Sequence, residues 1–277
     1  MPELPEVEVI KKGLEPLLVG LRVLQAGYGK PLRRPFPRSA MKEWIMGGVV
    51  QRLSRRGKYL VIRMENRAAM VFHLGMSGRL LVLPRTAPLS SHDHVRLTLD
   101  NNSMLRLHDP RRFGSLQITP PDATSRLLTG LFQQMGPEPL SADFTPATLH
   151  RDTRGRKRAI KDLLLDGRTV AGIGNIYASE SLFRAKIHPA AQAGTLSTIQ
   201  CARLHQAIQE VLIEAINCGG SSISDFTAPD GTAGYFQCAF KVYGRENQSC
   251  RLCGTPIARL RQSGRSTFFC PACQQAL

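Results

Sequence analysis

The feature that most constrains this chain is a set of four cysteines near its C-terminus. Two Cys-x2-Cys pairs, Cys250 with Cys253 and Cys270 with Cys273, are separated by sixteen residues. This spacing allows four thiolates to surround one Zn²⁺ ion tetrahedrally, and a closed set of four protein ligands is typical of a structural site. Redox-active dithiols are the alternative, but the βαβ context that they require is missing. The sequence therefore predicts one structural Zn²⁺ that stabilises a small β-hairpin.

The charge of the chain indicates its class of partner. Lys and Arg number 37 against 21 Asp and Glu, which gives a formal net charge of +16. Such an excess attracts polyanions, and nucleic acid is favoured over a membrane surface because no basic amphipathic anchor is visible. No apolar run is long enough to span a membrane, and the acidic first residues do not resemble a signal peptide. We therefore expect a cytoplasmic protein that binds nucleic acid.

The N-terminal half has the pattern of one helix followed by strands. Val7, Ile10, Leu14 and Leu17 recur at helical spacing over residues 5–18. Close-spaced apolar runs separated by turn residues then predict an antiparallel sandwich or barrel. The predicted strands are residues 59–65, 69–75, 79–83, 94–100 and 113–119.

The pattern changes after prolines accumulate between residues 135 and 146, where we expect a linker. The segment 156–167 places Ile160, Leu163 and Leu164 on one helix face, with Gly167 as its C-terminal stop. A glycine turn then leads into a second helix over residues 172–185, and a long third helix over 196–220 ends at two glycines. The second half is therefore predicted to be helical up to the cysteine-containing tail.

The first residues contain a candidate nucleophile. Methionine before proline is normally removed during synthesis, which would leave Pro2 with a free secondary amine. An α-amine has a pKa of about 8, so a useful fraction is unprotonated at neutral pH. Glu3 and Glu6 share one face of a helical first turn beside it, which suits Schiff-base chemistry with two proton carriers. Together with Glu8 they equally suit the positive end of a helix dipole, and the spacing alone leaves both interpretations open.

Several short motifs are distributed along the whole chain. They are MPELPEVE at the start, RRGKYL with Lys58, HLGMSG with Met76, HDH at 92–94, DPRRFG with Arg111 and Phe113, GIGNIYASE with Asn175, VYGR with Tyr243 and the four-cysteine tail with GRSTFFC. In this order they resemble the motifs of bacterial formamidopyrimidine-DNA glycosylases. The resemblance runs from residue 1 to the last cysteine.

The resemblance implies an α+β fold: an N-terminal β-sandwich with an N-terminal helix, a C-terminal helical helix-two-turn-helix domain and a zinc-finger β-hairpin. We expect a catalytic β-sandwich domain at 1–134, a linker at 135–150, a helix-two-turn-helix domain with a lesion-recognition loop at 151–235 and a four-cysteine zinc finger at 236–277. Ser221 and Ser222 lie in the stretch GGSSISDF, which resembles this loop but has serines where threonines are common in the family.

The resemblance also implies the reaction. It indicates a bifunctional glycosylase and abasic-site lyase of base excision repair, which removes 8-oxoguanine and formamidopyrimidines and cuts the strand by β,δ-elimination. By resemblance, the Pro2 amine attacks C1′ of the damaged nucleotide and forms a Schiff base, with Glu3 as general acid/base. Lys58 is implied in β-elimination and phosphate binding. Arg265 is implied in δ-elimination and in gripping the kinked backbone.

DNA contacts are implied in the same way. A base inside a duplex is out of reach, so the enzyme must flip it out and fill the gap. Met76, Arg111 and Phe113 match the family's wedge, in which a thioether and a ring occupy the vacated stack and a guanidinium pairs with the orphaned cytosine. Without the resemblance, Met76 and Phe113 would be assigned to the core and Arg111 to a solvated loop. Further DNA contacts are implied for His73, His92, Arg156, Asn175 and Tyr243.

The implied partner is damaged double-stranded DNA, bound by a nucleoid-associated monomer without a membrane or a small-molecule cofactor. An endonuclease VIII-like glycosylase acting on oxidised pyrimidines is the alternative within the class. Leu4 and the full wedge favour the purine enzyme. A catalytically silent DNA-binding zinc protein is the alternative from another class, but it would have no reason to retain Pro2, Glu3 and Lys58 together.

Overall fold

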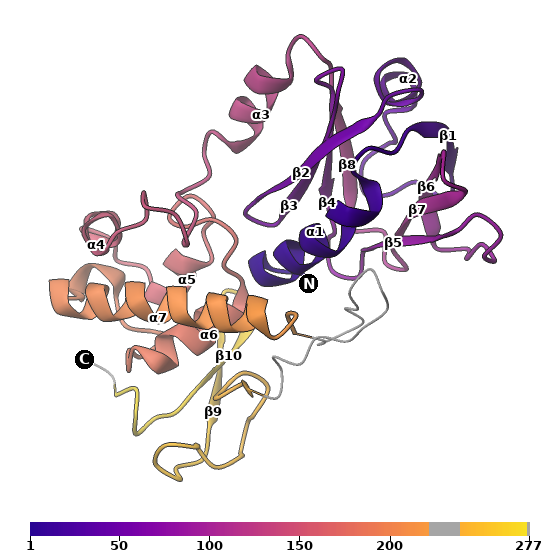
Figure 1. Ribbon diagram of the computed structural model, residues 1–277. Helices are drawn as coiled ribbons and strands as arrows, with labels where there is room; N and C mark the ends of the chain where they lie inside the picture. The colour runs from indigo at the N-terminus through magenta and orange to yellow at the C-terminus, as the bar shows by residue number, and fades with distance from the viewer. Residues whose placement is uncertain (222–238, 276–277) are drawn as a thin grey trace. The chain divides into compact units, whose positions relative to one another are not determined.

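The computed structural model describes residues 1–221 and 239–275, and the chain divides into two compact units (Figure 1). Among the described residues, the first unit comprises 1–133 with 219–221, and the second comprises 134–218 with 239–275. The division after Gln133 lies next to the predicted start of the linker. The return of the chain to the first unit at Gly219 differs from the expectation that 151–235 form a single domain.

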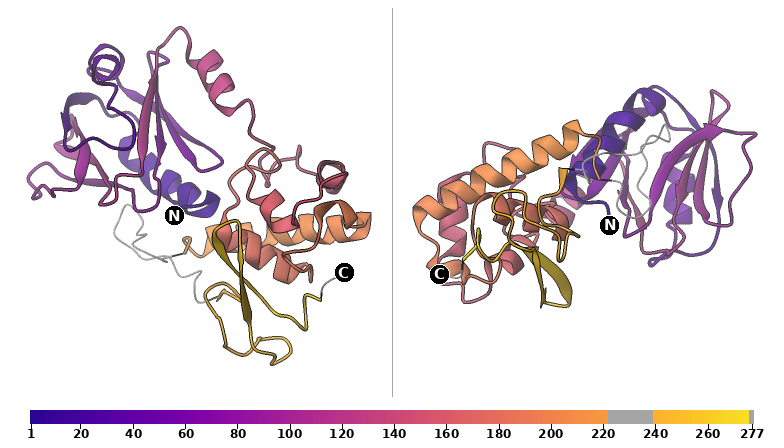
Figure 2. Two further views of the ribbon diagram at one scale, coloured as in Figure 1. Left: turned by 180° about the vertical axis from the view of Figure 1, so that it is seen from behind. Right: turned by 90° about the horizontal axis from the view of Figure 1, so that it is seen from below.

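Two four-stranded antiparallel sheets make up most of the first unit (Figures 1 and 2). One sheet has the strand order β1-β6-β7-β5 and the other β2-β3-β4-β8, which confirms the predicted β-sandwich. The strands are β1 (Val23–Tyr28), β2 (Val50–Arg56), β3 (Tyr59–Met64), β4 (Ala69–His73), β5 (Arg79–Pro84), β6 (Asp93–Leu99), β7 (Ser103–His108) and β8 (Ser115–Thr119).

Helix α1 (Leu4–Leu18) covers the sandwich and completes its core. Val7, Ile10 and Leu14 are buried as predicted, but Leu17 is 39% exposed and Leu18 takes its place in the core. Pro5 lies in the first turn, where its missing N–H costs no hydrogen bond. The short helix α2 (Arg38–Ala40) and the π-helix η1 (Met41–Ile45) follow β1. Helix α3 (Thr124–Phe132) packs on the outer face of the second sheet through Leu128.

The second unit is helical and ends in a two-stranded hairpin. Its elements are α4 (Pro146–Thr153), α5 (Ile160–Leu164), α6 (Asn175–Arg184), η2 (Ala193–Thr195), α7 (Thr198–Asn217), β9 (Ala258–Gln262) and β10 (Arg265–Phe269). Both α4 and α6 pack against α7. The side-chain oxygen of Thr145 accepts a hydrogen bond from the Thr148 N–H at 3.1 Å, so α4 begins inside the segment that was expected to be a linker.

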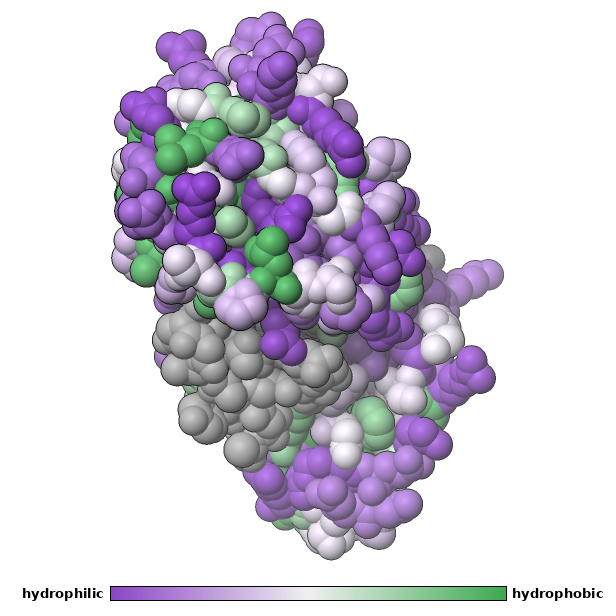
Figure 3. All heavy atoms as spheres, turned by 90° about the vertical axis from the view of Figure 1, so that its right-hand side faces the viewer, coloured by the Kyte–Doolittle hydropathy of each residue, from purple (hydrophilic) through white to green (hydrophobic). Residues whose placement is uncertain are grey.

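The surface of the protein is largely hydrophilic, as expected for a highly charged chain. Figure 3 shows hydrophilic side chains over most of the face in view, with hydrophobic residues in small groups. Within residues 1–221 and 239–275, no helix combines the length and the apolar character needed to cross a membrane.

Candidate functional site

A cavity of 1210 Å³ in the first unit contains the amino terminus. Met1 lines it and is 44% exposed, whereas Pro2 directly behind it is buried. Residues of β3, β4, β8, α3 and three loops line the cavity, and the sandwich brings them together from distant parts of the sequence. Among the residues lining it are Tyr59, His73, Met76, Arg111 and Phe113. The residue before the predicted nucleophile, one predicted DNA contact and the predicted wedge therefore line one cavity.

Two buried carboxylates lie behind the amino terminus. Glu3 and Glu6 are each only 2% exposed. One carboxylate oxygen of Glu6 accepts from the Glu3 N–H at 2.9 Å, and the other accepts from both the N–H and the hydroxyl of Ser221, each at 2.9 Å. Glu6 thus joins the first helical turn to a residue 215 positions later in the chain. Ser222, its predicted companion, lies outside the described residues.

The electrostatic environment of the amino terminus favours an unprotonated amine. Burial lowers the pKa of the Met1 amine below its usual 8.0, and this effect outweighs the opposing charges of Glu3 and Glu6. The positive charges of Lys58 and Arg111 lower the same pKa further. Lys58 lies in the turn between β2 and β3, and this turn brings its charge close enough to act on the amine.

The predicted wedge is exposed, as its proposed role requires. Met76 is 40% and Phe113 45% exposed, and the Arg111 guanidinium lies 5.0 Å from the centre of the Phe113 ring. The two loops that carry them touch at Gly75, which has a φ of +63°. A Cβ there would lie 2.5 Å from the Phe113 carbonyl carbon, so only glycine fits.

Asp109 holds the wedge loops together, a role that sequence reasoning missed. It is fully buried; one carboxylate oxygen accepts from the Ser77 hydroxyl at 2.6 Å and the other from the Gly114 N–H at 2.7 Å. The Ser77 oxygen in turn accepts from the Arg111 N–H at 3.2 Å. The available signal was an aspartate at the end of a strand, directly before a loop rich in proline and arginine.

The two predicted DNA-contacting histidines have different environments. His73 is half-buried beside Tyr59, and burial together with the charges of Lys58 and Arg33 lowers its pKa to about 4. It is therefore neutral at pH 7, and its Nδ1 accepts from the Gly75 N–H at 3.1 Å. His92 is exposed on the loop before β6, and its carbonyl accepts from the Asp109 N–H at 2.9 Å.

Two arginines of the cavity were not anticipated. Arg33 and Arg34 lie in the connection between β1 and α2 and line the same cavity as the wedge. The backbone N–H of Arg33 donates to the Arg112 carbonyl at 3.0 Å, so this connection is tied to the wedge loop. The pattern Arg-Arg-Pro was visible in the sequence, but a basic pair in a loop is usually only solvated.

The second unit contains the remaining predicted contacts. Arg156 lines a separate cavity of 610 Å³ together with Lys157, Arg158 and Arg168. Tyr243 packs its ring 5.2 Å from that of Phe268, against the β9–β10 hairpin. Four cations around one hollow suit a polyanion, although Asp152 and Asp166 also line it.

The fully buried Lys161, another residue missed from the sequence, joins α5 to the hairpin. Its ammonium donates to the Asn175 carbonyl oxygen at 2.5 Å and to the Thr267 hydroxyl at 2.7 Å. The Asn175 amide donates to the Ser266 carbonyl at 2.9 Å. The side chain of Asn175 therefore fixes the start of α6 beside the strand that begins with the exposed Arg265.

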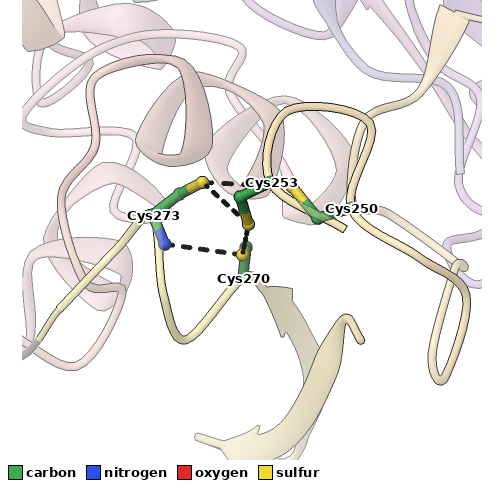
Figure 4. A group of neighbouring side chains, drawn as sticks. All are labelled: Cys250, Cys253, Cys270 and Cys273. Carbon is green, nitrogen blue, oxygen red and sulfur yellow. Dashed lines mark hydrogen bonds between the residues drawn. The ribbon is translucent and has the colours of Figure 1, made fainter. Parts of the chain in front are cut away.

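The four cysteines converge at the end of the second unit (Figure 4). Neighbouring sulfurs lie 3.5 Å apart for Cys253 and Cys270, and 4.0 Å apart for Cys250 and Cys273. A tetrahedral site with Zn–S bonds of about 2.3 Å requires sulfurs about 3.8 Å apart, whereas a disulfide requires about 2.05 Å. Backbone N–H groups of Leu252 and Cys273 also point at cluster sulfurs, at 3.4 Å each. The cluster therefore fits one structural Zn²⁺.

The fold and the site together define a class of protein: a β-sandwich with its amino terminus in a cavity, followed in the chain by a helical unit and a hairpin with a four-cysteine zinc site. Three family models match the chain in that order. They are the formamidopyrimidine-DNA glycosylase N-terminal domain at residues 1–116, the formamidopyrimidine-DNA glycosylase H2TH domain at 135–227 and the zinc finger found in FPG and IleRS at 247–276. The chain belongs to the formamidopyrimidine-DNA glycosylase family.

Individual relatives are similar to this chain over their full lengths. The chain is 46% identical to the formamidopyrimidine-DNA glycosylase of Thioalkalivibrio sulfidiphilus and 44% identical to that of Geotalea uraniireducens, covering 99% of this chain and 100% of each relative. Among solved structures, MutM (FPG) from Thermus thermophilus has a TM-score of 0.87 and 39% identity, with 100% of both chains covered. A Lactococcus lactis FPG variant bound to Fapy-dG containing DNA has a TM-score of 0.91 and 36% identity, covering 99% of this chain and 100% of that one.

Proposed function

We propose that this protein is a bifunctional DNA glycosylase and abasic-site lyase that removes oxidised purines from double-stranded DNA. The observation that carries the proposal is the placement of the amino terminus in a cavity, with two buried carboxylates behind it and the exposed Met76, Arg111 and Phe113 around it. Similar proteins of solved structure hold DNA with Fapy-dG, an abasic site or carbocyclic 8-oxo-G, which supports the substrate class. The protein acts as a cytoplasmic monomer.

The chemistry begins at Pro2. Loss of Met1 turns the proline nitrogen into the amine that faces the cavity, and its lone pair attacks C1′ of the damaged nucleotide. The glycosidic bond breaks with its electron pair going to the base, which takes up the proton that the attacking amine gives up and leaves neutral. Glu3 supplies a proton to the deoxyribose ring oxygen as the ring opens and the iminium forms. The iminium acidifies C2′, so that removal of a C2′ proton expels the 3′ phosphate.

The remaining residues hold the DNA and complete strand cleavage. Lys58 binds phosphate and assists the β-elimination, and Arg265 grips the backbone and assists the δ-elimination of the 5′ phosphate. Met76 and Phe113 fill the space that the flipped nucleotide vacates, and Arg111 pairs with the orphaned base. Further phosphate contacts come from His73, His92, Arg156, Asn175 and Tyr243. Residues 1–134 form the catalytic domain, 151–235 the helix-two-turn-helix domain with Ser221 and Ser222 in its lesion loop, and 236–277 the zinc finger.

Borohydride trapping tests the proposed function directly. We expect a covalent complex with duplexes that carry a single 8-oxoguanine, because borohydride reduces the imine to a stable amine. The protein is incubated separately with 8-oxoguanine, dihydrouracil and undamaged duplexes, and adducts are separated on a denaturing gel. Preferential trapping on dihydrouracil would instead support the alternative function, an endonuclease VIII-like glycosylase that acts on oxidised pyrimidines. Binding without an adduct on any damaged duplex would leave only the silent DNA-binding protein.

Replacement of Glu6 separates its positioning role from proton transfer. In Glu6→Gln, one of the two carboxylate oxygens becomes an NH2 group that faces either the Glu3 N–H or the Ser221 donors, so a buried donor loses its acceptor. We expect a loss of about 1–3 kcal/mol in the free energy of unfolding. We also expect about tenfold slower trapping in single-turnover experiments, because the amine and the lesion loop are no longer aligned.

A matched control is Glu15→Gln on the same helix, whose carboxylate is 41% exposed and 3.8 Å from Lys11. This variant should unfold and trap like the unchanged chain, because exposed ion pairs contribute little. Urea denaturation gives the free energy of unfolding and quenched-flow trapping gives the rate. Unchanged stability in Glu6→Gln, combined with a complete loss of trapping, would show that Glu6 carries a proton instead of positioning the N-terminus.

A further inference from the structure

Three imidazole rings meet at the edge of the first unit. The exposed ring of His92 lies edge-on to two others, with its centre 5.7 Å from that of His108 at 89° and 6.3 Å from that of His94 at 81°. Within residues 1–221 and 239–275, neither ring nitrogen of His92 has a hydrogen-bond partner; the bonds of this residue are made by its backbone, whose N–H donates to the Ser90 hydroxyl at 3.2 Å and whose carbonyl accepts from the Asp109 N–H at 2.9 Å. The two neighbouring rings are therefore what orients this side chain.

Both neighbouring rings are fixed. His94 is fully buried and its Nε2 donates to the Asp109 carbonyl at 3.1 Å. His108 is partly exposed, and its Nδ1 donates to a carboxylate oxygen of Asp93 at 2.9 Å. Burial lowers the pKa of His94, so this neighbour is neutral at pH 7.

The anchor of His108 is itself held in place. The second carboxylate oxygen of Asp93 accepts from the Ser90 N–H at 2.9 Å and from the guanidinium of Arg106 at 3.3 Å. Arg106 is 1% exposed and donates to the carbonyls of Ala87 and Pro88 at 2.7 Å each. The loop that carries His92 is thus built on a buried ion pair, and His108 extends that pair to the surface.

We propose that His108 is a positioning residue for DNA binding: fixed by Asp93, its ring holds the exposed imidazole of His92 in the orientation that meets a phosphate. This inference rests on the proposed function, in which His92 contacts DNA. An edge-to-face ring pair restricts the rotamers of an otherwise unbonded side chain, and a side chain ordered before binding loses less entropy when it binds.

Two variants separate the ring of His108 from its hydrogen bond. His108→Asn keeps a donor for Asp93 but removes the ring, whereas His108→Phe keeps the ring but removes the donor. We expect His108→Asn to weaken binding about fivefold, the fold-change of one aromatic pair. His108→Phe should weaken it less, by about twofold, because its ring still packs against His92 but is no longer anchored to Asp93. Fluorescence anisotropy with a duplex carrying a tetrahydrofuran abasic analogue measures the affinities. The control His150→Asn, on α4, should bind normally.

The same measurements in a His92→Ala background complete the test. There His108→Asn should cause no further loss, and the ring proton signals of His92 should shift in His108→Asn but not in His150→Asn. An equal loss in both backgrounds would overturn the proposal, because His108 would then contact DNA itself or support the fold. Normal binding by His108→Asn combined with weak binding by His108→Phe would likewise overturn the proposal. Normal binding by His92→Ala would also overturn it, while trapping would still report separately on the proposed function.

Discussion

A chain that keeps Met1 is expected to lose strand cleavage and borohydride trapping while it still binds DNA. Insertion of a leucine between Met1 and Pro2 prevents removal of the methionine and places the Pro2 nitrogen in an amide, whose lone pair is not nucleophilic. We expect the trapping rate to fall by at least about a thousandfold, the scale of removing a catalytic nucleophile. Affinity for a duplex with a tetrahydrofuran abasic analogue should change by less than about tenfold, because most contacts to phosphate lie elsewhere.

The physical reason lies in the local environment of the amine. Burial already lowers the pKa of the Met1 amine, and the positive charges of Lys58 and Arg111 act in the same direction. The Pro2 nitrogen is closer to the start of α1, whose partial positive charge also disfavours protonation. A deprotonated secondary amine at this position is a competent nucleophile at neutral pH, whereas an amide nitrogen at the same position is not nucleophilic.

The experiment requires mass spectrometry of the intact protein to establish which N-terminus each preparation carries. The unmodified chain with Pro2 at its terminus serves as the matched control in the trapping and anisotropy assays. Trapping at full rate by the leucine-inserted chain would identify a different nucleophile. The amine of the retained Met1 and the side chain of Lys58 would then be the candidates, and Lys58→Met in the inserted chain would distinguish between them.

Features that depend on a short spacing between residues could be predicted from the sequence. Helix α1 follows from apolar residues at helical spacing and from Pro5 in its first turn, and the cysteine cluster follows from two Cys-x2-Cys pairs. The single error in α1, Leu17 in place of Leu18, arises because these adjacent leucines lie at opposite borders of the apolar stripe, where helical spacing allows either of them to be the buried one. Such features depend on residues close in sequence, so one chain is enough to reveal them.

Three strands were missed for physical reasons. Strands β1 and β2 are edges of their sheets, and β2 buries only Val50 and Leu53 among seven residues that include three arginines. Edge strands carry charges that protect them from pairing with other chains. These charges obscure the alternation of apolar and polar residues by which a strand is predicted from sequence. Strand β7 is central, but the buried Arg106 interrupts its apolar pattern. Its burial is explained only by partners at residues 87, 88 and 93.

The polar groups that organise the site could not be predicted either. Glu6 bonds to Ser221 across 215 residues, and Asp109 bonds to Ser77 across 32. No local pattern encodes such pairs, because they exist only once the sandwich has formed. The resemblance to the family supplied Met76, Arg111 and Phe113. The exposure of Met76 and Phe113 contradicts the core assignment that their chemistry alone would have favoured, whereas Arg111 is exposed as a loop arginine would be.

Loss of the metal is expected to unfold the hairpin and weaken DNA binding by about a hundredfold, or about 2.7 kcal/mol. The hydrophobic cluster around β9 and β10 contains only five buried residues, and two of them are Cys250 and Cys270. Without a metal, these thiolates would repel one another and the remaining cluster would be too small to hold the hairpin. Arg265 would then lose the fixed position from which it is proposed to grip the backbone.

Cys270→Ser tests this expectation, with Cys218→Ser as the matched control, because Cys218 is an exposed free thiol outside the cluster. Metal content by mass spectrometry, thermal unfolding and anisotropy with the abasic-analogue duplex are measured for each. The Cys270 variant should lose the zinc, and unfolding of the hairpin would remove Thr267 from the buried Lys161 ammonium. The second unit should therefore become less stable while the β-sandwich retains its own core. Normal DNA affinity in a zinc-free variant would show that the hairpin does not contribute to binding, and Arg265 would lose its proposed role.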